Sequence, residues 1–422
     1  MGGSYVKQKV QGIFQDPARQ KRALERLNID NADQLVETLG TLKGAAMKLG
    51  QGMANVASGL DLPEEVTTRL AKLHKDAEPI AFRIIKEDIE AQLERPLDEA
   101  FASFEPRPIG TASLGQAHAA SLPDGRQVVV KVLHRGIDGT VRSDLAALKA
   151  VLLTGRFLRR NRGEVDAIFD EIRARLEEEL DYLQEAANIH EFSQLLANTP
   201  GVRIPKVHPG WSTERVLTMD RLPGMDLEQF LAQSTPQARQ RAGTTLANLL
   251  FTQIFRLRTL HADPHPGNYL FDADGTVGLL DFGCVKRFDE FWIADYARSG
   301  LAAVEGRRAD CLQACRDLGA LHGASPEAEE LLWQMVTTLL HPMTQGRYTV
   351  GAHGDTVLER IAPIGHKLVR YPQVRAPRDL VYLHRSLGGT YVLLRRLVVR
   401  GDWGAMLQEH GSYAIACAEG RT

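Results

Sequence analysis

The chain lacks several features that would assign it quickly to a class of proteins. Its 422 residues include four cysteines, and these form no pair of Cys-x-x-Cys clusters, which argues against a zinc-binding module. Lys and Arg number 51 against 53 Asp and Glu, so the net charge of -2 gives no overall attraction for nucleic acid. We therefore expect buried thiols in a reducing compartment and no nucleic-acid partner.

Long apolar runs are missing as well. No stretch approaches the roughly 18 uninterrupted apolar residues that a membrane-spanning helix needs, and the first residues contain no apolar signal region. We also find no internal repeat and no low-complexity tract. These absences predict a cytoplasmic protein that contacts the inner membrane peripherally at most.

The composition, with 44% hydrophobic and 25% charged residues, allows two or three domains with a real core. The organising stretch is His-Ala-Asp-Pro-His-Pro-Gly-Asn at residues 261–268, followed by Asp281-Phe282-Gly283. An Asp, an Asn five residues later and an Asp before Phe-Gly have the spacing of a kinase catalytic loop and its metal-binding turn.

We assign Asn268 and Asp281 as Mg²⁺ ligands, because Mg²⁺ prefers oxygen ligands and shares them with nucleotide phosphates. Asp263 is the candidate catalytic residue that accepts a hydroxyl proton or orients a water, a role worth about 10²–10⁴ in rate. The structural alternative is a proline-rigid loop capped by polar side chains, in which His261 is a core histidine that braces the loop and His265 is a turn residue. We assign neither histidine a metal. That alternative accounts for each short piece alone, but not for their order and spacing together.

A single Lys interrupts the apolar strand predicted at residues 127–133. Because an unpaired buried ammonium is costly, Lys131 must find a carboxylate. Its position matches the Val-Ala-Ile-Lys strand of kinases, whose Lys holds the α- and β-phosphates, so we also place it in catalysis. Most carboxylates of the helix predicted at residues 164–196 are expected at the surface. We choose Glu185 as the partner because the Ala and Asn residues after it indicate a tightly packed face.

Small residues dominate a predicted loop at residues 108–118. Small side chains let backbone N–H groups approach phosphate oxygens, and an ordinary hairpin turn is the alternative, because the loop is not Gly-x-Gly-x-x-Gly. A strand predicted at residues 215–219 precedes a break at residues 220–224 that reads as a hinge between lobes. The candidate nucleotide contacts in these segments are Ala112, Ser113, Gly115, Gln116 and Met219.

Near the N-terminus a helix is predicted at residues 31–58. Lys48 and Gln51 lie three residues apart and share a face, while Gly50 and Gly52 leave the backbone beside them bare. Each Gly costs up to about 1 kcal/mol relative to Ala in a helix, which suggests close approach to another element. Taken alone, a Lys and a Gln on a helix are more often solvated than functional.

The remaining sequence signals predict the elements before and after residues 261–268. Two strands around a turn at residues 272–275 predict a hairpin that returns Asp281 towards Asn268. From residue 288 to the end the chain reads as all-helical, with a close-contact point at Gly388-Gly389, and it has no Ala-Pro-Glu signature or long activation segment. The other predicted elements are helices at 79–95 and 235–258 and a strand at 202–207.

In order and content these motifs resemble the UbiB/AarF atypical kinase-like family, which is associated with ubiquinone biosynthesis. The resemblance extends from about residue 35 to residue 403. Two departures are Gly110 and Thr111, where the family usually has consecutive alanines, and the expected absence of a membrane-spanning C-terminal hairpin. The motifs that carry the resemblance are Lys48-Leu49-Gly50-Gln51, Ala112-Ser113-Leu114-Gly115-Gln116, Val130-Lys131, Glu179-Leu180-Asp181, residues 261–268 and Asp281-Phe282-Gly283.

The resemblance implies an α+β, protein-kinase-like two-lobe fold with an N-terminal helical extension and an all-helical C-terminal lobe. We place the extension at residues 1–78, the N-lobe at 79–221 and the C-lobe at 222–422. It also implies that the helix carrying Lys48 covers the active site as a lid, with Lys48 taking part in catalysis through an ion pair to Glu179 or Asp181. Gln51 and these two carboxylates would then lie beside the nucleotide.

Members of the family look like ATPases or small-molecule or lipid-directed kinases, which implies ATP and Mg²⁺ as cofactors. Our first hypothesis is an atypical kinase or ATPase that handles an isoprenoid, quinone-precursor or lipid ligand in ubiquinone or related metabolism. The second is a non-catalytic, ATP-gated switch that binds a lipid or a protein. The third is a small-molecule kinase resembling the aminoglycoside and choline kinases, which lack the Lys-x-Gly-Gln helix. The sequence leaves a homodimer open.

Overall fold

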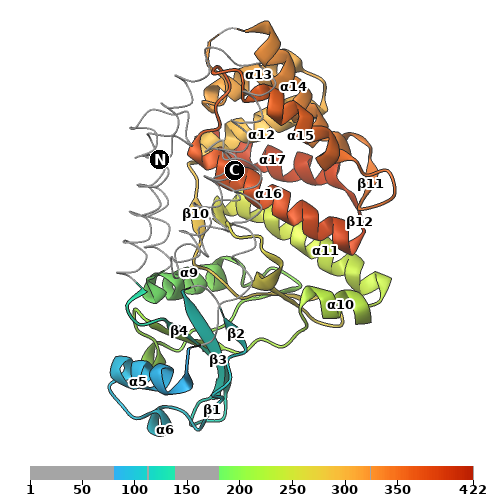
Figure 1. The fold of residues 1–422 in the computed structure, drawn as a ribbon. Coiled ribbons are helices and arrows are strands. Elements are labelled where there is room, and N and C mark those ends of the chain that lie inside the picture. The colour runs from blue at the N-terminus through green and yellow to red at the C-terminus, as the bar shows by residue number, and fades with distance from the viewer. Residues whose placement is uncertain (1–79, 112–113, 138–179, 324, 422) are drawn as a thin grey trace, which may run out of the picture. The chain divides into compact units, whose positions relative to one another are not determined.

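The computed structural model describes residues 80–111, 114–137, 180–323 and 325–421 (Figure 1). The helix predicted at residues 31–58 lies outside the described residues, and so do Ala112, Ser113 and Glu179. The described residues form two compact units. Unit 1 contains the described residues up to Ala187 together with Val207–Arg221, and unit 2 contains Asn188–Lys206 and the described residues from Leu222 onwards. The predicted lobe boundaries stay a prediction.

Unit 1 is built on an antiparallel sheet with the strand order β1-β3-β4-β6, and β2 pairs with β3. The long strands are rich in Val and Ala, and the β-branched Val residues favour a pleated, half-buried surface. The strands are β1 (Ser103–Phe104), β2 (Gly110–Thr111), β3 (Gly115–Ser121), β4 (Gln127–Leu133) and β6 (Val216–Asp220). The helices are α5 (Phe82–Leu93), α6 (Leu97–Ala100), the 3₁₀ turn η2 (Pro209–Trp211) and the start of α9 (Tyr182–Leu195).

Helix α5 corresponds to the helix predicted at residues 79–95, and it covers one face of this sheet (Figure 1). Its buried Ile85 and Ile89 lie one turn apart and pack with Val130 and Val132 of β4. Because side chains alternate along a strand, Lys131 between these valines projects from the opposite face. The alternation therefore keeps the lone charge of β4 out of the apolar core.

The continuous helix predicted at residues 164–196 is wrong at its middle. Leu180 lies in a turn and Asp181 is not helical, so α9 begins only at Tyr182. The Asp181 carboxylate accepts hydrogen bonds from the backbone N–H groups of Leu183, at 2.9 Å, and Gln184, at 3.2 Å. An Asp that satisfies the first N–H groups of a helix acts as its N-cap, which explains the break.

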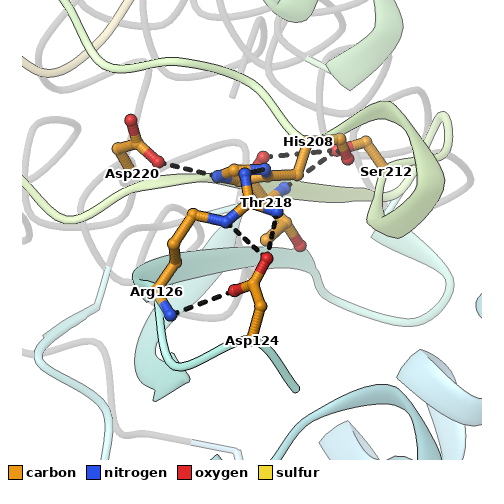
Figure 2. A network of polar contacts seen from close by, with 6 residues as sticks. All are labelled: Asp124, Arg126, His208, Ser212, Thr218 and Asp220. Carbon is orange, nitrogen blue, oxygen red and sulfur yellow. Dashed lines mark hydrogen bonds and ion pairs between the residues drawn. The ribbon is translucent and has the colours of Figure 1, made fainter. Parts of the chain in front are cut away.

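A polar network fastens the turn between β3 and β4 to the end of β6 (Figure 2). Arg126 donates to the Asp124 carboxylate, at 2.8 Å, and its Nη1 lies 3.4 Å from Nδ1 of the buried His208. Since Arg can only donate, His208 accepts at Nδ1 and donates from Nε2 to Asp220 Oδ1, at 2.7 Å. The network fixes β6 just before the chain passes into unit 2.

Unit 2 contains three small sheets among helices. Their strand pairings are β5-β9-β8, β7 with β10, and β11 with β12. The strands are β5 (Val202–Arg203), β7 (Thr259–His261), β8 (Tyr269–Phe271), β9 (Val277–Leu279), β10 (Val285–Arg287), β11 (Arg347–Val350) and β12 (Val399–Asp402). The helices are α10 (Leu227–Gln233), α11 (Pro236–Phe251), η3 (Thr252–Leu257), η4 (Pro266–Asn268), α12 (Glu290–Val304), α13 (Arg308–Asp317), α14 (Pro326–Leu339), η5 (His341–Thr344), α15 (Val357–Leu368), α16 (Arg378–Leu397) and α17 (Trp403–Ala418).

The helix predicted at residues 235–258 leads directly into the organising stretch. It is observed as α11, which lies beside α16 (Figure 1) and continues as the π-helical segment η3. Arg258 takes a left-handed backbone conformation with φ of 53°, which ends the segment before β7. Buried apolar residues on η3 and β7, including Ile254 and Leu260, belong to one core cluster, which holds β7 against the helices.

The expectation that the chain is all-helical from residue 288 onwards is wrong. Strands β11 and β12 pair antiparallel, with Arg347 opposite Asp402 and Val350 opposite Val399. Each strand has four residues, so their alternation is too short to stand out from helical periodicity in the sequence. The C-terminal part of the chain is therefore mixed, although helices dominate it.

Two further expectations concern membranes and thiols. None of the described helices combines the length and apolarity that crossing a membrane requires. None of the four cysteines forms a disulfide bond; Cys311 and Cys315 are buried as predicted, whereas Cys284 and Cys417 are only half-buried. Both buried thiols approach the Ser299 hydroxyl from α13, at 3.6 and 3.5 Å, so they belong to the core of unit 2.

Candidate functional site

The predicted ion pair between Lys131 and Glu185 is confirmed. Lys131 Nζ lies 2.6 Å from Glu185 Oε1, and the side chains are 16% and 6% exposed. Such burial removes both charges from water, so each requires the other. The reason for choosing Glu185 holds only in part, because Asn188 is buried while Ala187 is exposed.

Helix α9 presents Glu185 to the sheet through close packing at Gly115. A Cβ on Gly115 would lie 2.4 Å from the Val132 carbonyl oxygen and 3.1 Å from the Tyr182 hydroxyl. Tyr182 and Glu185 lie three residues apart and therefore share a face of α9. Gly115 thus allows the strands and the helix to approach closely beside Lys131.

The Gln116 side chain lies on the face of the sheet opposite to Lys131. It pairs with Val132 in the sheet register, whereas Lys131 pairs with Ala117 and Leu217. Its amide accepts from the Ile80 backbone N–H, at 3.0 Å, and donates to Nε2 of buried His118, at 2.8 Å. Any contact of Gln116 with a nucleotide held by Lys131 would consequently be through its backbone.

Two other predicted contacts lie in unit 1. Met219 pairs with Val129, two residues from Lys131, so its side chain lies on the Lys131 face of the sheet. Asp181 is exposed and caps α9. Their roles toward a nucleotide stay predictions, as do those of Lys48, Gln51, Glu179, Ala112 and Ser113, which lie outside the described residues.

In unit 2 a polar contact joins Asp263 and Asn268 across the loop at residues 262–268, here called the Asp263 loop. Asn268 Nδ2 lies 2.8 Å from Asp263 Oδ2 and 3.2 Å from the Asp263 carbonyl oxygen. Both partners are acceptors, so the amide must direct its NH₂ group to Asp263 and its Oδ1 elsewhere. The described residues offer Asn268 Oδ1 no partner.

The predicted hairpin is confirmed, and it returns the chain to Asn268. Strands β8 and β9 pair from Tyr269 with Leu279 to Phe271 with Val277, and the Leu280 N–H donates to the Asn268 carbonyl oxygen, at 3.0 Å. Asp281 follows directly. The Asp281 carboxylate accepts from the Gly283 N–H, at 3.0 Å, which sets the turn after β9.

Phe282 and His261 anchor the segments that carry Asp281 and Asp263. Phe282 is fully buried, and its ring lies 5.2 Å from Phe192 and 5.4 Å from His261 between centroids. His261 donates from Nε2 to the Asp281 carbonyl oxygen, and burial lowers the pKa of its imidazole. The neutral His261 therefore braces the loop, as the structural alternative for this residue proposed.

Sequence reasoning missed two contributors to this arrangement in unit 2. Asn188 Nδ2 donates to the Phe282 carbonyl oxygen, at 2.8 Å, and Arg385 donates to the Ala262 carbonyl oxygen. Both donate to backbone carbonyl groups, which every residue has, so the residue types in the sequence do not indicate these contacts. The only signal for Asn188 was its place after Glu185, and Arg385 stands four residues before Gly389.

The donor set fits a hard divalent ion shared with a phosphate ligand. Asn268 Oδ1 and the Asp281 carboxylate are oxygen donors on segments joined by the Leu280 hydrogen bond. No group of three or more His, Cys, Asp or Glu side chains in the described part of the chain is arranged to hold a metal ion.

Comparison with known proteins gives a consistent picture. A family described as ABC1 atypical kinase-like domain matches residues 72–315. Atypical kinase COQ8B, mitochondrial, of Rattus norvegicus is 31% identical over 375 residues, which span 87% of this chain and 69% of the rat protein. Atypical kinase COQ8, mitochondrial, of Saccharomyces cerevisiae is 26% identical over 395 residues, spanning 92% and 78%.

A solved structure extends the comparison to the fold. It is described as the complex structure of Rv3197-erythromycin from Mycobacterium tuberculosis, and it matches with a TM-score of 0.64 at 26% identity. The match covers 93% of this chain and 98% of the mycobacterial one.

Proposed function

Because the chain belongs to the ABC1 atypical kinase-like family, we propose that it is a Mg²⁺-dependent, ATP-binding enzyme that hydrolyses ATP or transfers its γ-phosphoryl group to a small acceptor. The predicted membership of the UbiB/AarF family and the α+β, protein-kinase-like fold are confirmed. The activity itself is the proposal.

The observation that carries the proposal is the contact between Asn268 and Asp263. One amide group holds the carboxylate through its NH₂ and directs its oxygen elsewhere, so a metal ligand and a candidate base are fixed relative to each other. Asp281 supplies the second oxygen ligand from the hairpin.

Bound Mg²⁺ would neutralise the charge that develops on the phosphate oxygens during transfer. Asn268 and Asp281 would hold that ion, and Lys131, fixed by Glu185, would bind the α- and β-phosphates. Asp263 would accept the proton from the attacking hydroxyl or water at its carboxylate. The backbone of the segment that ends at Gly115 would contact phosphate oxygens through N–H groups.

The pathway is a finer proposal. The rat and yeast relatives are named COQ8B and COQ8, and the motifs resemble a family associated with ubiquinone biosynthesis, so we place the activity in ubiquinone or related isoprenoid metabolism. The mycobacterial neighbour is described in complex with erythromycin, a macrolide with a large carbon ring. A hydrophobic ligand is therefore the substrate class to test first.

The test is phosphate release from Mg·ATP by the full chain, alone and with an isoprenoid phenol, a macrolide or lipid vesicles. Asp281→Asn should abolish release, because the amide cannot neutralise the metal as a carboxylate does. The matched control is Asp274→Asn, at an exposed position in the turn of the same hairpin, which should keep the parent rate. If ATP shifts the melting temperature without phosphate release, the enzyme reading fails and the ATP-gated switch replaces it.

A further inference from the structure

Helix α16 touches the Asp263 loop where the helix has no side chain. A Cβ built on Gly389 would lie 2.2 Å from Cγ and 2.6 Å from Cβ of Pro264, closer than real Cβ atoms approach other atoms. The neighbouring Gly388 is different, because no atom of the described residues lies within 4 Å of its built Cβ. Gly389 is therefore the contact point, and Gly388 is not.

A second contact lies one turn earlier on α16. Arg385 donates from Nη2 to the Ala262 carbonyl oxygen, and the same nitrogen lies 3.3 Å from Cys284 Sγ. The Arg385 Nε is buried and has no partner among the described residues. The half-buried Arg385 guanidinium therefore donates to a backbone carbonyl group next to Asp263 and not to a carboxylate of the described residues.

A third contact joins the start of α16 to β10, the strand that follows the Asp281 turn. Asp379 lies 2.8 Å from Lys286 Nζ, and the Lys286 ammonium also lies 5.5 Å from the Tyr382 ring centroid. Residues 379, 382, 385 and 389 recur at steps of three and four, so they occupy one stripe of the helix. One face of α16 therefore supports both the Asp263 loop and the strand after Asp281.

These contacts bracket Asp263. Arg385 holds the carbonyl of the residue before it, and Gly389 receives the ring of the residue after it. We propose that Arg385 and Gly389 are positioning residues that set the place of the Asp263 carboxylate in the reaction. The proposal rests on the proposed function, because it assigns a role in the chemistry that Asp263 would perform.

The effect should fall on turnover rather than on nucleotide binding. The ion pair of Lys131 and Glu185 and the hairpin that carries Asp281 do not depend on the Pro264 contact. A displacement of about 1 Å at a catalytic group can cost about 10²-fold in rate. Moving Pro264 away from α16 would impose a displacement of that order on Asp263.

The experiment compares Gly389→Ala with Gly388→Ala in the full chain. Both changes favour helix to the same degree, so a difference between them reports the Pro264 contact. We expect kcat for phosphate release to fall about 10²-fold in Gly389→Ala, with the KM for ATP within about threefold of the parent. Gly388→Ala should stay within about twofold of the parent in both constants. Equal kcat values for the two variants would overturn the proposal.

Coupling to Pro264 separates positioning from general instability. If Gly389 acts through Pro264, the double change Gly389→Ala with Pro264→Gly should have no lower kcat than Pro264→Gly alone. Multiplicative losses would overturn the proposal. If Gly389→Ala does not fold, Arg385→Met against Arg385→Lys replaces it, and only the lysine variant should recover kcat, since it can still donate to the Ala262 carbonyl oxygen.

Amide hydrogen exchange of residues 261–268 keeps this test independent of the proposed function. Exchange in this segment should accelerate in Gly389→Ala and not in Gly388→Ala, whether or not the parent releases phosphate. If the parent does not release phosphate, only the proposed enzyme function is contradicted. If exchange is unchanged in Gly389→Ala, the contact between α16 and the Asp263 loop is contradicted. An active parent with unchanged kcat in Gly389→Ala would end this inference alone.

Discussion

The candidate groups of the two units are held in different ways. In unit 1 the charges of Lys131 and Glu185 neutralise each other at 2.6 Å in a buried setting. In unit 2 Asp263 is half-buried, is held by the neutral amide of Asn268, and has no ion-pair partner among the described residues. Unit 1 thus holds a buried cation next to its counter-charge, whereas in unit 2 the Asp263 carboxylate is held by a neutral group.

The largest effect should come from removing the charge of Asp263. Asp263→Asn keeps the shape of the side chain and can still contact Asn268, but it cannot accept a proton. We expect kcat for phosphate release to fall by about 10²–10⁴, with ATP affinity close to that of the parent. A variant that kept its kcat would show that Asp263 is only a loop-capping residue, as the structural alternative holds.

Breaking the unit 1 pair should cost stability as well as binding. Glu185→Gln removes the carboxylate charge that lies 2.6 Å from the buried Lys131 ammonium, so we expect a loss of about 3–5 kcal/mol in the free energy of unfolding by urea. The double variant Lys131→Met with Glu185→Leu should recover most of that stability, because apolar pairs often replace buried ion pairs without loss. It should not recover ATP binding. A double variant as unstable as the single one would contradict mutual neutralisation.

A pH effect should arise in unit 1 from His118. Burial lowers the pKa of its imidazole, which donates from Nδ1 to the Glu105 carbonyl oxygen. Below the unfolded value of about 6.5 the unfolded chain binds a proton that the folded chain does not, so stability falls as the pH is lowered from 7 to 5. The slope from one such group is at most about 1.4 kcal/mol per pH unit. His118→Asn should reduce this slope, and His353→Asn, at an exposed position, should not.

The smallest effect separates two roles of Asp181. Asp181→Ala removes the cap of α9 and should lower stability by about 1 kcal/mol, whereas Asp181→Asn keeps a good cap. If the carboxylate also pairs with Lys48, Asp181→Asn should still change phosphate release at unchanged melting temperature. An unchanged rate in Asp181→Asn would leave Asp181 with the structural role alone.

The parts that sequence could predict were those encoded by spacing and alternation. The hairpin of β8 and β9 followed from a turn between two short apolar runs, and the Lys131 pair followed from one charge in an apolar strand. Both signals are local, or concern a charge that has few alternatives to a carboxylate partner. The spacing of Asp263 and Asn268 indicated a kinase-like loop, whereas the hydrogen bond between the two side chains is known only from the structure.

The parts that sequence could not predict depend on register, backbone acceptors or short strands. The direction of the Gln116 side chain depends on which residue of β4 pairs with it. The start of α9 depends on whether Asp181 caps the helix or lies inside it. Arg385 and Asn188 bind carbonyl groups, which every residue possesses. Gly389 was recognised as a close-contact point, but its neighbour Pro264 is remote in sequence.

The most direct test of the account is the titration of ATP into the full chain by calorimetry, with Mg²⁺ and with a chelator, for the parent and for Asp281→Asn. If Asn268 and Asp281 hold Mg²⁺, as we propose, ATP binding by the parent should weaken at least about tenfold without Mg²⁺, a difference of about 1.4 kcal/mol. Asp281→Asn in Mg²⁺ should then resemble the parent in chelator. A parent that binds ATP equally well in both conditions, or an Asp281→Asn variant that keeps the full Mg²⁺ dependence, would contradict the account.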